Sequence, residues 1–195
     1  MNREILLLRE APRGFYLGDT AQVARDLIGA WLVRLDRGAW YGARIVETEA
    51  YLGASDPAAH TWRGRRTKRV EPMYMDGGHV YVFLVYGMHH CANIVTREPG
   101  VGEAVLIRAA AGPAGAPPRL LSGPGRFCAA LGITRSCSGV DLLAGGPLRL
   151  MLPGGPPPEI AVGPRIGVAY AGEAKDWPLR FFQADSPAVS VRRHP

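Results

Sequence analysis

The sequence predicts an α+β fold: a single compact domain built on a curved, mainly antiparallel β-sheet, with a few short helices and a protruding β-hairpin. Three observations favour this class. Short runs of β-branched and aromatic residues recur along the chain, Gly- and Pro-rich turns separate them, and few segments have helical periodicity. With 47% hydrophobic content in 195 residues there is material for one core, so we expect one domain over residues 1–195.

A helix and a hairpin are expected near the start of the chain. Asp19 or Thr20 can cap a helix that runs to about Ile28, because apolar side chains recur there at helical spacing and a glycine follows. Residues 30–35 and 40–46 have the composition of strands. The tripeptide Asp-Arg-Gly between them is a hairpin signal.

The middle of the chain carries the strongest strand signal, at residues 79–85. This run turns at Tyr86-Gly87-Met88 and returns as residues 90–95, and residues 104–110 form another apolar run. Ahead of them, residues 53–78 lack regular patterning. Loops of this length are usually functional or disordered.

The last third of the chain is expected to hold short elements between Gly- and Pro-rich turns. Residues 112–118 are typical of a surface loop, and a short helix follows Ser122-Gly123-Pro124. Four further strands are expected at residues 148–152, 165–170, 179–182 and 189–191.

The charge of the chain is compatible with a polyanionic partner. The net charge is +6 and the isoelectric point is about 9.6. All 23 Lys and Arg residues except Lys68 and Lys175 are arginines, and arginine binds phosphate bidentately and stacks on planar groups. A GC-rich genome explains the same arginine-rich balance equally well, so composition leaves both explanations open.

Cysteine spacing and hydropathy bound the location of the protein. Cys91, Cys128 and Cys137 form an odd set without Cys-x-x-Cys spacing, which argues against a disulfide framework or a zinc ribbon. Charged residues interrupt the short apolar run within residues 1–14, so no signal peptide is expected. The most apolar stretch, residues 80–95, is too short and too polar to cross a bilayer. We therefore expect a cytoplasmic protein, nucleoid-associated if bacterial, that does not contact a membrane.

Two carboxylates at the end of an apolar strand are the first candidates for chemistry. Glu47, Glu49 and Tyr51 alternate, so in a strand they share one face, and His60 follows nine residues later. Such a face suits a general base beside an aromatic stacking surface. Taken alone, the segment fits an edge strand with a solvated acidic face even better.

The tip of the central hairpin is the second candidate. Hairpin tips normally carry Asn, Asp or Gly, whereas this one presents Tyr86 and Met88 around Gly87. An apolar side chain on such a tip has the shape of the wedge that base-flipping proteins insert between base steps. The alternative is a hairpin folded onto the core with Tyr86 buried.

Polar residues within the predicted strands add further candidates. Asn93 either bonds a neighbouring strand or lines a pocket, since an unpartnered buried amide costs about 1–3 kcal/mol. Arg108 closes an apolar run, and Glu49 is a natural partner that it would keep ionised, as a general base requires. His89 and Cys91 could share one strand face, but no third or fourth ligand is evident nearby, so no metal site is expected.

Together these residues resemble the alkyladenine (3-methyladenine) DNA glycosylase family, of the type without a helix-hairpin-helix. The resemblance covers most of the chain from about Tyr16 and is strongest over residues 44–109. Several separate motifs in the same order are more specific than any one of them. The motifs are Arg44 to Gly53, Asp56 with Ala58-Ala59-His60, Gly64-Arg65, Tyr81 to Met88, Asn93-Ile94, Leu106 to Ala109, Ser122-Gly123-Pro124, Ala130-Leu131, Arg165 to Val168 and Pro178 to Phe181.

The resemblance implies catalytic roles for three positions. Glu49 would be the general base that activates a water molecule against C1′ of a flipped nucleotide. Arg108 and the backbone carbonyl of Ile166 would help to place that water. No cofactor is implied, and because neither lysine lies in these motifs, a monofunctional enzyme that leaves an abasic site is expected rather than a glycosylase-lyase.

The resemblance also implies a base pocket and a wedge. Tyr51 and His60 would form two sides of the damaged-base pocket, with His60 also bonding the base edge or nearby backbone. Asn93 would crowd the exocyclic amine of guanine. Tyr86, with Met88 beside it, would be the minor-groove wedge that replaces the extruded nucleotide.

The chain departs from the family pattern in two places. Phe83 stands where the family commonly has a tyrosine, so that wall of the pocket keeps a stacking face without a hydroxyl. The segment Gly112 to Leu121 is shorter and richer in Pro and Gly than in longer members. The first departure bears on substrate preference and the second on the DNA footprint.

The sequence therefore predicts a cofactor-independent enzyme, expected to be a monomer, whose partner is double-stranded DNA containing damaged purines. It does not rank 3-methyladenine, 7-methylguanine, hypoxanthine and ethenoadenine as substrates. Two rivals stay open: a nucleic-acid-binding module without catalysis, and a hydrolase of free nucleosides or sugars. Phosphate contacts are expected from the basic residues of the long loop, namely Arg63, Arg65, Arg66, Lys68 and Arg69.

Overall fold

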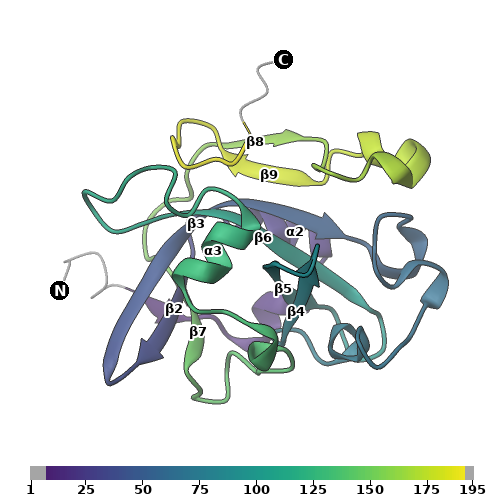
Figure 1. The fold of residues 1–195 in the computed structure, drawn as a ribbon, viewed down its shortest axis with the longest axis horizontal. Coiled ribbons are helices and arrows are strands. Elements are labelled where there is room, and N and C mark those ends of the chain that lie inside the picture. Colours follow the sequence, from purple (N-terminus) through teal and green to yellow (C-terminus); the bar gives the residue numbers. More distant parts are fainter. Residues whose placement is uncertain (1–7, 192–195) are drawn as a thin grey trace.

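The computed structural model describes residues 8–191, whose strands form one curved antiparallel sheet (Figure 1). The strand order is β1-β7-β2-β3-β6-β5-β4, and a β8–β9 hairpin joins the sheet through β3. The strands are β1 (Arg9–Glu10), β2 (Trp31–Asp36), β3 (Ala39–Tyr51), β4 (Val80–Val85), β5 (His89–Thr96), β6 (Glu103–Ala111), β7 (Leu148–Leu152), β8 (Ile160–Gly163) and β9 (Arg180–Gln183). The predicted α+β class, with one domain on a curved antiparallel sheet, is confirmed.

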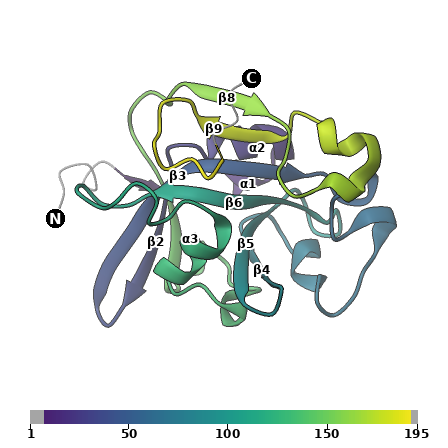
Figure 2. The same ribbon diagram turned by 45° about the horizontal axis from the view of Figure 1, so that its top comes forward.

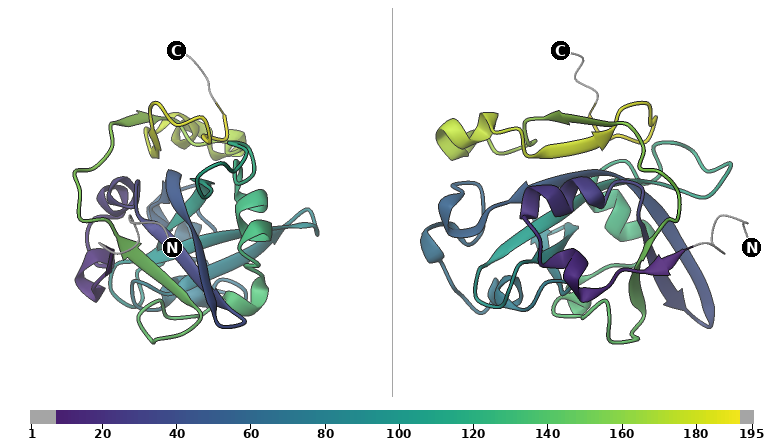
Figure 3. Two further views of the ribbon diagram at one scale, coloured as in Figure 1. Left: turned by 90° about the vertical axis from the view of Figure 1, so that its left-hand side faces the viewer. Right: turned by 180° about the vertical axis from the view of Figure 1, so that it is seen from behind.

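Short helices pack on both sides of this sheet. The α-helices are α1 (Arg13–Tyr16), α2 (Thr20–Asp26) and α3 (Pro124–Ala130), and the 3-10 turns are η2 (Gly53–Ser55), η3 (Trp62–Gly64), η4 (Glu71–Tyr74), η5 (Arg135–Cys137) and η6 (Ala169–Asp176). Helix α3 lies in front of the sheet in Figure 1, whereas α2 faces the viewer from behind (Figure 3, right). As predicted, Asp19 caps α2, its carboxylate accepting the Gln22 N–H at 3.0 Å. Across residues 8–191, no helix is both long enough and apolar enough to cross a membrane.

Strand β3 connects the parts of the sheet. Its first half pairs with β2 through a tight turn in which Arg37 and Gly38 have φ of 49° and 81°, as the hairpin signal predicts. Its second half pairs with β6 on one edge and with β9 on the other. Figures 1 and 2 show β8 and β9 above this half. The β3–β6 register is irregular at Glu47. The part of β3 that carries Glu47 and Glu49 pairs with β6 on one edge and with β9 on the other.

The main core fixes this frame. Leu27 of α2, Ile45 of β3, Ile107 of β6 and Phe127 of α3 are fully or almost fully buried in one cluster. Burial of each such side chain contributes roughly 1.5–3 kcal/mol, so the sheet and both helices form one rigid unit beneath the site.

The loop of residues 53–78 is ordered, although no strand crosses it. The Tyr74 hydroxyl donates to the Arg65 carbonyl at 2.9 Å, and the buried Thr61 hydroxyl donates to the Gly102 carbonyl at 2.7 Å. Its backbone forms three short 3-10 turns rather than a disordered segment.

Two predicted strands are wrong. Residues 165–170 form a bend and the start of η6, because Gly167 has a φ of 80° and the Ile166 N–H bonds a side chain instead of a strand. Residues 189–191 form no strand either, since the Ser190 N–H also bonds a carboxylate. The sequence analysis missed α1, β1 and β8, which are short or partly exposed. Its interpretation of residues 1–14 rests in part on residues 1–7, which lie outside the described residues.

Candidate active site

Glu49 is a fully buried carboxylate held by groups from three parts of the chain. Its Oε1 accepts the Ile166 N–H at 2.8 Å, and its Oε2 accepts the Tyr51 hydroxyl at 2.9 Å. Arg108 Nη1 of β6 lies 3.4 Å from Oε1. Glu49 and Tyr51 therefore share a face of β3, and Arg108 is the ion-pair partner that the sequence suggested.

Burial sets the acidity of this group. Loss of hydration raises the pKa of the Glu49 carboxyl above its ordinary value, while Arg108, the Ile166 N–H and the Tyr51 hydroxyl act in the opposite direction. Burial and the neighbouring Glu49 also raise the pKa of Tyr51 well above its ordinary value, so the phenol remains a hydrogen-bond donor. A carboxylate with a raised pKa is a stronger base than an exposed one.

A cavity of about 410 Å³ lies on the other side of the residues that bond this carboxylate, and Glu49 itself is not part of its lining. Tyr51, Arg108 and Ile166, the three residues that bond Glu49, all line it. The other predicted site residues in its lining are His60, Phe83, Asn93 and Tyr86. The structure thus brings together seven predicted residues from four strands, two loops and a hairpin tip, around a cavity of ordinary ligand-site size.

Aromatic rings form one wall of the cavity. The His60 ring meets the Phe83 ring edge-on at a centroid distance of 4.5 Å, and Phe83 stacks on Tyr81 at 5.7 Å. The Tyr81 hydroxyl and His60 Nδ1 lie 2.9 Å apart, which fixes the imidazole. Burial, with Arg69 and Arg65 nearby, lowers the pKa of His60 to about 4, so the ring is neutral at neutral pH.

Asn93 both bonds a neighbouring strand and lines a pocket, the two alternatives that the sequence left open. Its Nδ2 donates to the Tyr81 carbonyl on β4 at 3.1 Å, and its side chain lines the cavity. The amide is therefore fixed in orientation while it faces whatever occupies the cavity.

The β4–β5 hairpin projects from the body beyond α3 (Figure 3, left). Tyr86 and Met88 at its tip are 88% and 71% exposed, so the alternative of a buried Tyr86 is wrong. Tyr86 and Gly87 have φ of 52° and 70°, and the Met88 N–H closes the turn on the Val85 carbonyl at 3.1 Å. Positive φ at a bulky residue costs about 1–3 kcal/mol, a strain typical of functional positions.

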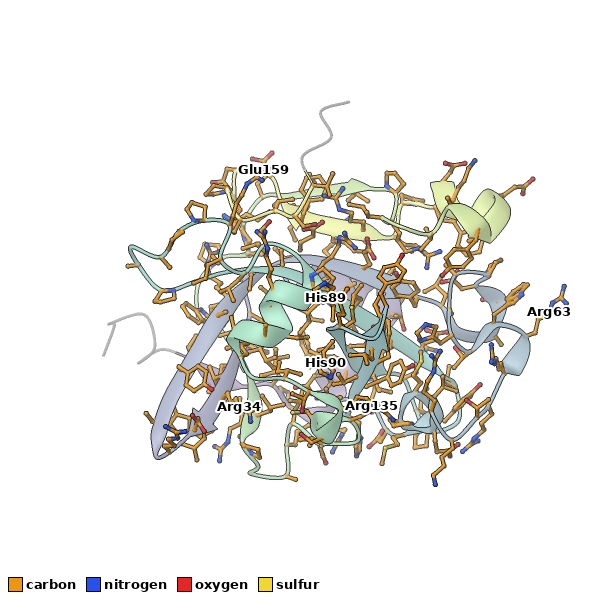
Figure 4. The ribbon with its side chains drawn as sticks, viewed as in Figure 1. Arg34, Arg63, His89, His90, Arg135 and Glu159 are labelled. Atoms are coloured by element: carbon orange, nitrogen blue, oxygen red, sulfur yellow. The ribbon has the colours of Figure 1, made fainter. Side chains whose placement is uncertain are left out.

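The basic residues of the long loop stand outside the cavity. Arg63, Arg65, Arg66, Lys68 and Arg69 are all exposed, and none lines the cavity. Figure 4 shows Arg63 pointing outward at the edge of the molecule. Arg66 pairs with the exposed Glu71, its Nε lying 3.0 Å from Oε2. Within residues 8–191, the other four basic residues of this group form no ion pair.

The sequence analysis missed a buried ion pair behind the cavity. Arg165 and Asp56 lie within two of the quoted motifs, yet nothing in their spacing indicates that they meet. The Arg165 guanidinium binds both carboxylate oxygens of Asp56, lies over the Tyr51 ring at 4.8 Å and donates to the Ala50 carbonyl at 3.0 Å. Arg165 thereby covers one face of the Tyr51 ring, and its bonds anchor the backbone next to Ile166.

Other features contribute less to the site. Tyr170 at the cavity mouth was also missed, and Met88 is absent from the lining. His89 packs against Gly125 of α3, and Figure 4 shows the His89 label next to this helix. Within residues 8–191, no three His, Cys, Asp or Glu side chains are grouped so as to hold a metal ion. A larger cavity of about 850 Å³, lined by Trp31, Trp40 and other residues of the β2–β3 hairpin, contains none of the predicted site residues.

Comparison with known proteins places this chain in a family. The model of the methylpurine-DNA glycosylase (MPG) family matches residues 14–187. The chain belongs to this family. Curated relatives provisionally named 3-methyladenine DNA glycosylase include one from Desulfitobacterium hafniense, 44% identical over 95% of this chain and 100% of the relative. Another, from Myxococcus xanthus, is 47% identical over 92% of each chain.

A third relative with the same provisional name comes from Methanocella arvoryzae and is 44% identical over 93% of this chain and 96% of its own length. Methylpurine-DNA glycosylase similarity therefore spans the β3 carboxylates, the aromatic wall and the hairpin together. The family suggested by the sequence motifs is confirmed.

Proposed function

We propose that this protein is a DNA repair glycosylase that flips alkylated or deaminated purines out of duplex DNA and hydrolyses the N-glycosidic bond, leaving an abasic site. One observation carries the proposal: the three residues that bond the buried Glu49 carboxylate all line one aromatic cavity. The exposed, strained Tyr86 tip on the rim of that same cavity supports the base-flipping part.

Glu49 acts as the general base in this scheme. It accepts a proton from a water molecule as the water oxygen bonds C1′, and the electron pair of the glycosidic bond leaves with the purine. Arg108 keeps the carboxylate ionised, and Ile166 fixes one of its oxygens. Because alkylation already weakens the bond, a single activated water suffices, and no Schiff-base lysine is needed.

The aromatic wall selects the substrate class. Electron-poor or cationic purines stack favourably on Tyr51, Phe83 and the neutral His60 ring, by stacking and by cation–π attraction. Asn93, fixed by its bond to Tyr81, crowds the exocyclic amine of guanine. Phe83 offers no hydroxyl, so hydrogen bonds to the base come from His60 and from the backbone.

Binding to duplex DNA precedes the chemistry. Tyr86 and Met88 enter the minor groove, where the contacts they gain offset an unstacking cost of a few kcal/mol. The exposed cations of residues 63–69 contact phosphates, so affinity falls with salt concentration. We propose that the protein acts as a monomer in the cytoplasm, without a cofactor.

Release of free base from duplex oligonucleotides tests the proposal. Oligonucleotides containing hypoxanthine or a methylated purine are incubated with wild type, Glu49→Gln and Glu159→Gln under single-turnover conditions. Glu159 is exposed at the top of the molecule in Figure 4 and does not line the cavity, so the same substitution there serves as a matched control. We expect excision by wild type and the control, and binding without excision by Glu49→Gln.

The two rivals give different results. If the protein is a binding module without catalysis, none of the three protein variants releases a base from either oligonucleotide. A hydrolase of free nucleosides cleaves nucleosides and loses no activity in Tyr86→Ser, because the hairpin tip has no role in that reaction.

A further inference from the structure

Glu47 is a second buried carboxylate on the same face of β3, and it lies outside the cavity lining. Its Oε1 accepts Arg180 Nε at 2.7 Å, and its Oε2 accepts the Ser190 N–H at 2.6 Å. Arg108 Nε lies 3.3 Å from Oε1. Both carboxylate oxygens of Glu47 are thus bonded to protein groups.

Arg108 is shared between the two carboxylates. Its Nε faces Glu47 and also donates to the Ser190 hydroxyl at 3.1 Å, whereas its Nη1 faces Glu49 at 3.4 Å. A guanidinium is planar and rigid, so two acceptors on Nε determine where Nη1 points.

The charges of the cluster explain why Arg108 serves Glu49. Of the three ion pairs in the cluster, Arg180–Glu47 is the shortest, and Arg180 Nη2 is itself fixed by the Val191 carbonyl at 2.6 Å. Since Arg180 neutralises Glu47, the charge of Arg108 remains available for Glu49.

We infer that Glu47 and Ser190 are positioning residues for the reaction: they hold the Arg108 guanidinium in the orientation that keeps the Glu49 carboxylate placed and ionised. The inference rests on the proposed function. It also assigns a role to residues 189–191, which fold back across β3 and β6 to supply the second acceptor.

A pH profile separates this role from mere support of the fold. The titratable and charged groups that face Glu49 are Arg108, Tyr51 and Glu47, with Cys91 and Tyr170 also in electrostatic range. The negative charge of Glu47 raises the Glu49 pKa. Removing that charge while leaving Arg108 in place therefore lets Glu49 ionise at lower pH.

The first experiment compares Glu47→Gln with wild type by single-turnover excision across pH, alongside thermal unfolding. We expect the acid limb of the rate to move to lower pH, because the negative charge that raises the Glu49 pKa is removed. We also expect the plateau rate to fall at least several-fold. Gln183→Ala, which removes a bond to Arg44 between the same two strands, is the control and retains the wild-type profile.

Ser190→Ala tests the same inference without removing a buried charge. The Ser190 N–H to Glu47 persists, but Arg108 Nε loses one acceptor. Because Arg108 lowers the Glu49 pKa, we expect the acid limb to move to higher pH, with a several-fold lower plateau and unchanged DNA binding. A wild-type plateau rate or a wild-type acid limb in Ser190→Ala, or a wild-type plateau rate in folded Glu47→Gln, overturns the inference. Absence of excision by the wild-type protein would instead reject the proposed function.

Discussion

The Arg165–Asp56 pair gives the sharpest quantitative prediction for Asp56→Ala. Arg165 is 5% exposed and Asp56 is fully buried, and two N–H groups of the guanidinium meet both carboxylate oxygens. Asp56 also accepts the Leu52 and Ala58 N–H groups at 3.0 and 2.9 Å. The substitution leaves a buried cation without its partner and removes the acceptor of two backbone donors.

Breaking a buried pair in this way costs about 3–5 kcal/mol, against a total unfolding free energy of about 5–15 kcal/mol for a domain. In a domain of this size, each kcal/mol lowers Tm by about 2–4 °C, so Tm should fall by about 6–20 °C. Arg165 also packs over Tyr51 and directly precedes Ile166, which bonds Glu49. Excision should therefore fall at temperatures where the variant remains folded.

An exposed pair of similar geometry provides the control. Arg66 Nε and Nη2 lie 3.0 and 2.5 Å from the two carboxylate oxygens of Glu71, but both side chains are about half exposed. Solvent screens such a pair, so Glu71→Ala should leave Tm close to that of wild type. Thermal unfolding followed by circular dichroism measures both variants. Equal Tm values for the two would refute the reasoning that burial, rather than geometry, sets the contribution of the pair.

Four further outcomes are expected. Tyr86→Ser should lower excision from duplex DNA more than from single-stranded DNA, because only the duplex requires a wedge; equal losses would reject the wedge. Asn93→Ser should relax discrimination against guanine-derived lesions, and unchanged relative rates on adenine- and guanine-derived lesions would contradict that assignment. Since burial raises the pKa of Glu49, wild-type excision should decline with falling pH above the range in which an exposed glutamate titrates, as single-turnover rates would show. Arg63→Ala and Arg65→Ala should each weaken binding uniformly across sequences and reduce the salt slope by about one, as fluorescence anisotropy would show.

Local signals predicted much of the fold because they arise from neighbouring residues. The Asp19 cap, the Arg37-Gly38 turn and the alternation in β4 and β5 each depend on a few consecutive side chains. The two wrong strands, near Ile166 and Ser190, failed for one reason. In both segments, a backbone N–H bonds a glutamate side chain of β3 more than a hundred residues away, and a local pattern of apolar residues contains no record of that partner.

The candidate site divides in the same way. Alternation placed Glu49 and Tyr51 on one face, because the spacing within strands is regular. The position of Arg108 after the apolar run of residues 105–107 indicated a carboxylate partner. The Asp56–Arg165 pair was not predictable, since an arginine in a bend and an aspartate in a loop have no spacing that relates them. Family resemblance supplied the roles of the residues, whereas the supports behind them became visible only in three dimensions.

The structure suggests why such supports are needed. A glutamate with a raised pKa binds its proton more tightly in the folded protein than in the unfolded chain, so ionising Glu49 costs stability as pH rises through its folded-state pKa. The left-handed Tyr86 adds a second local cost at the hairpin tip. Arg108 pairs with Glu49 itself, and the Arg180–Glu47 and Arg165–Asp56 pairs fix the residues around it. Ionised Glu49 and the left-handed Tyr86 are thus both required by the proposed reaction and both unfavourable to stability, so favourable contacts elsewhere in the fold must offset them.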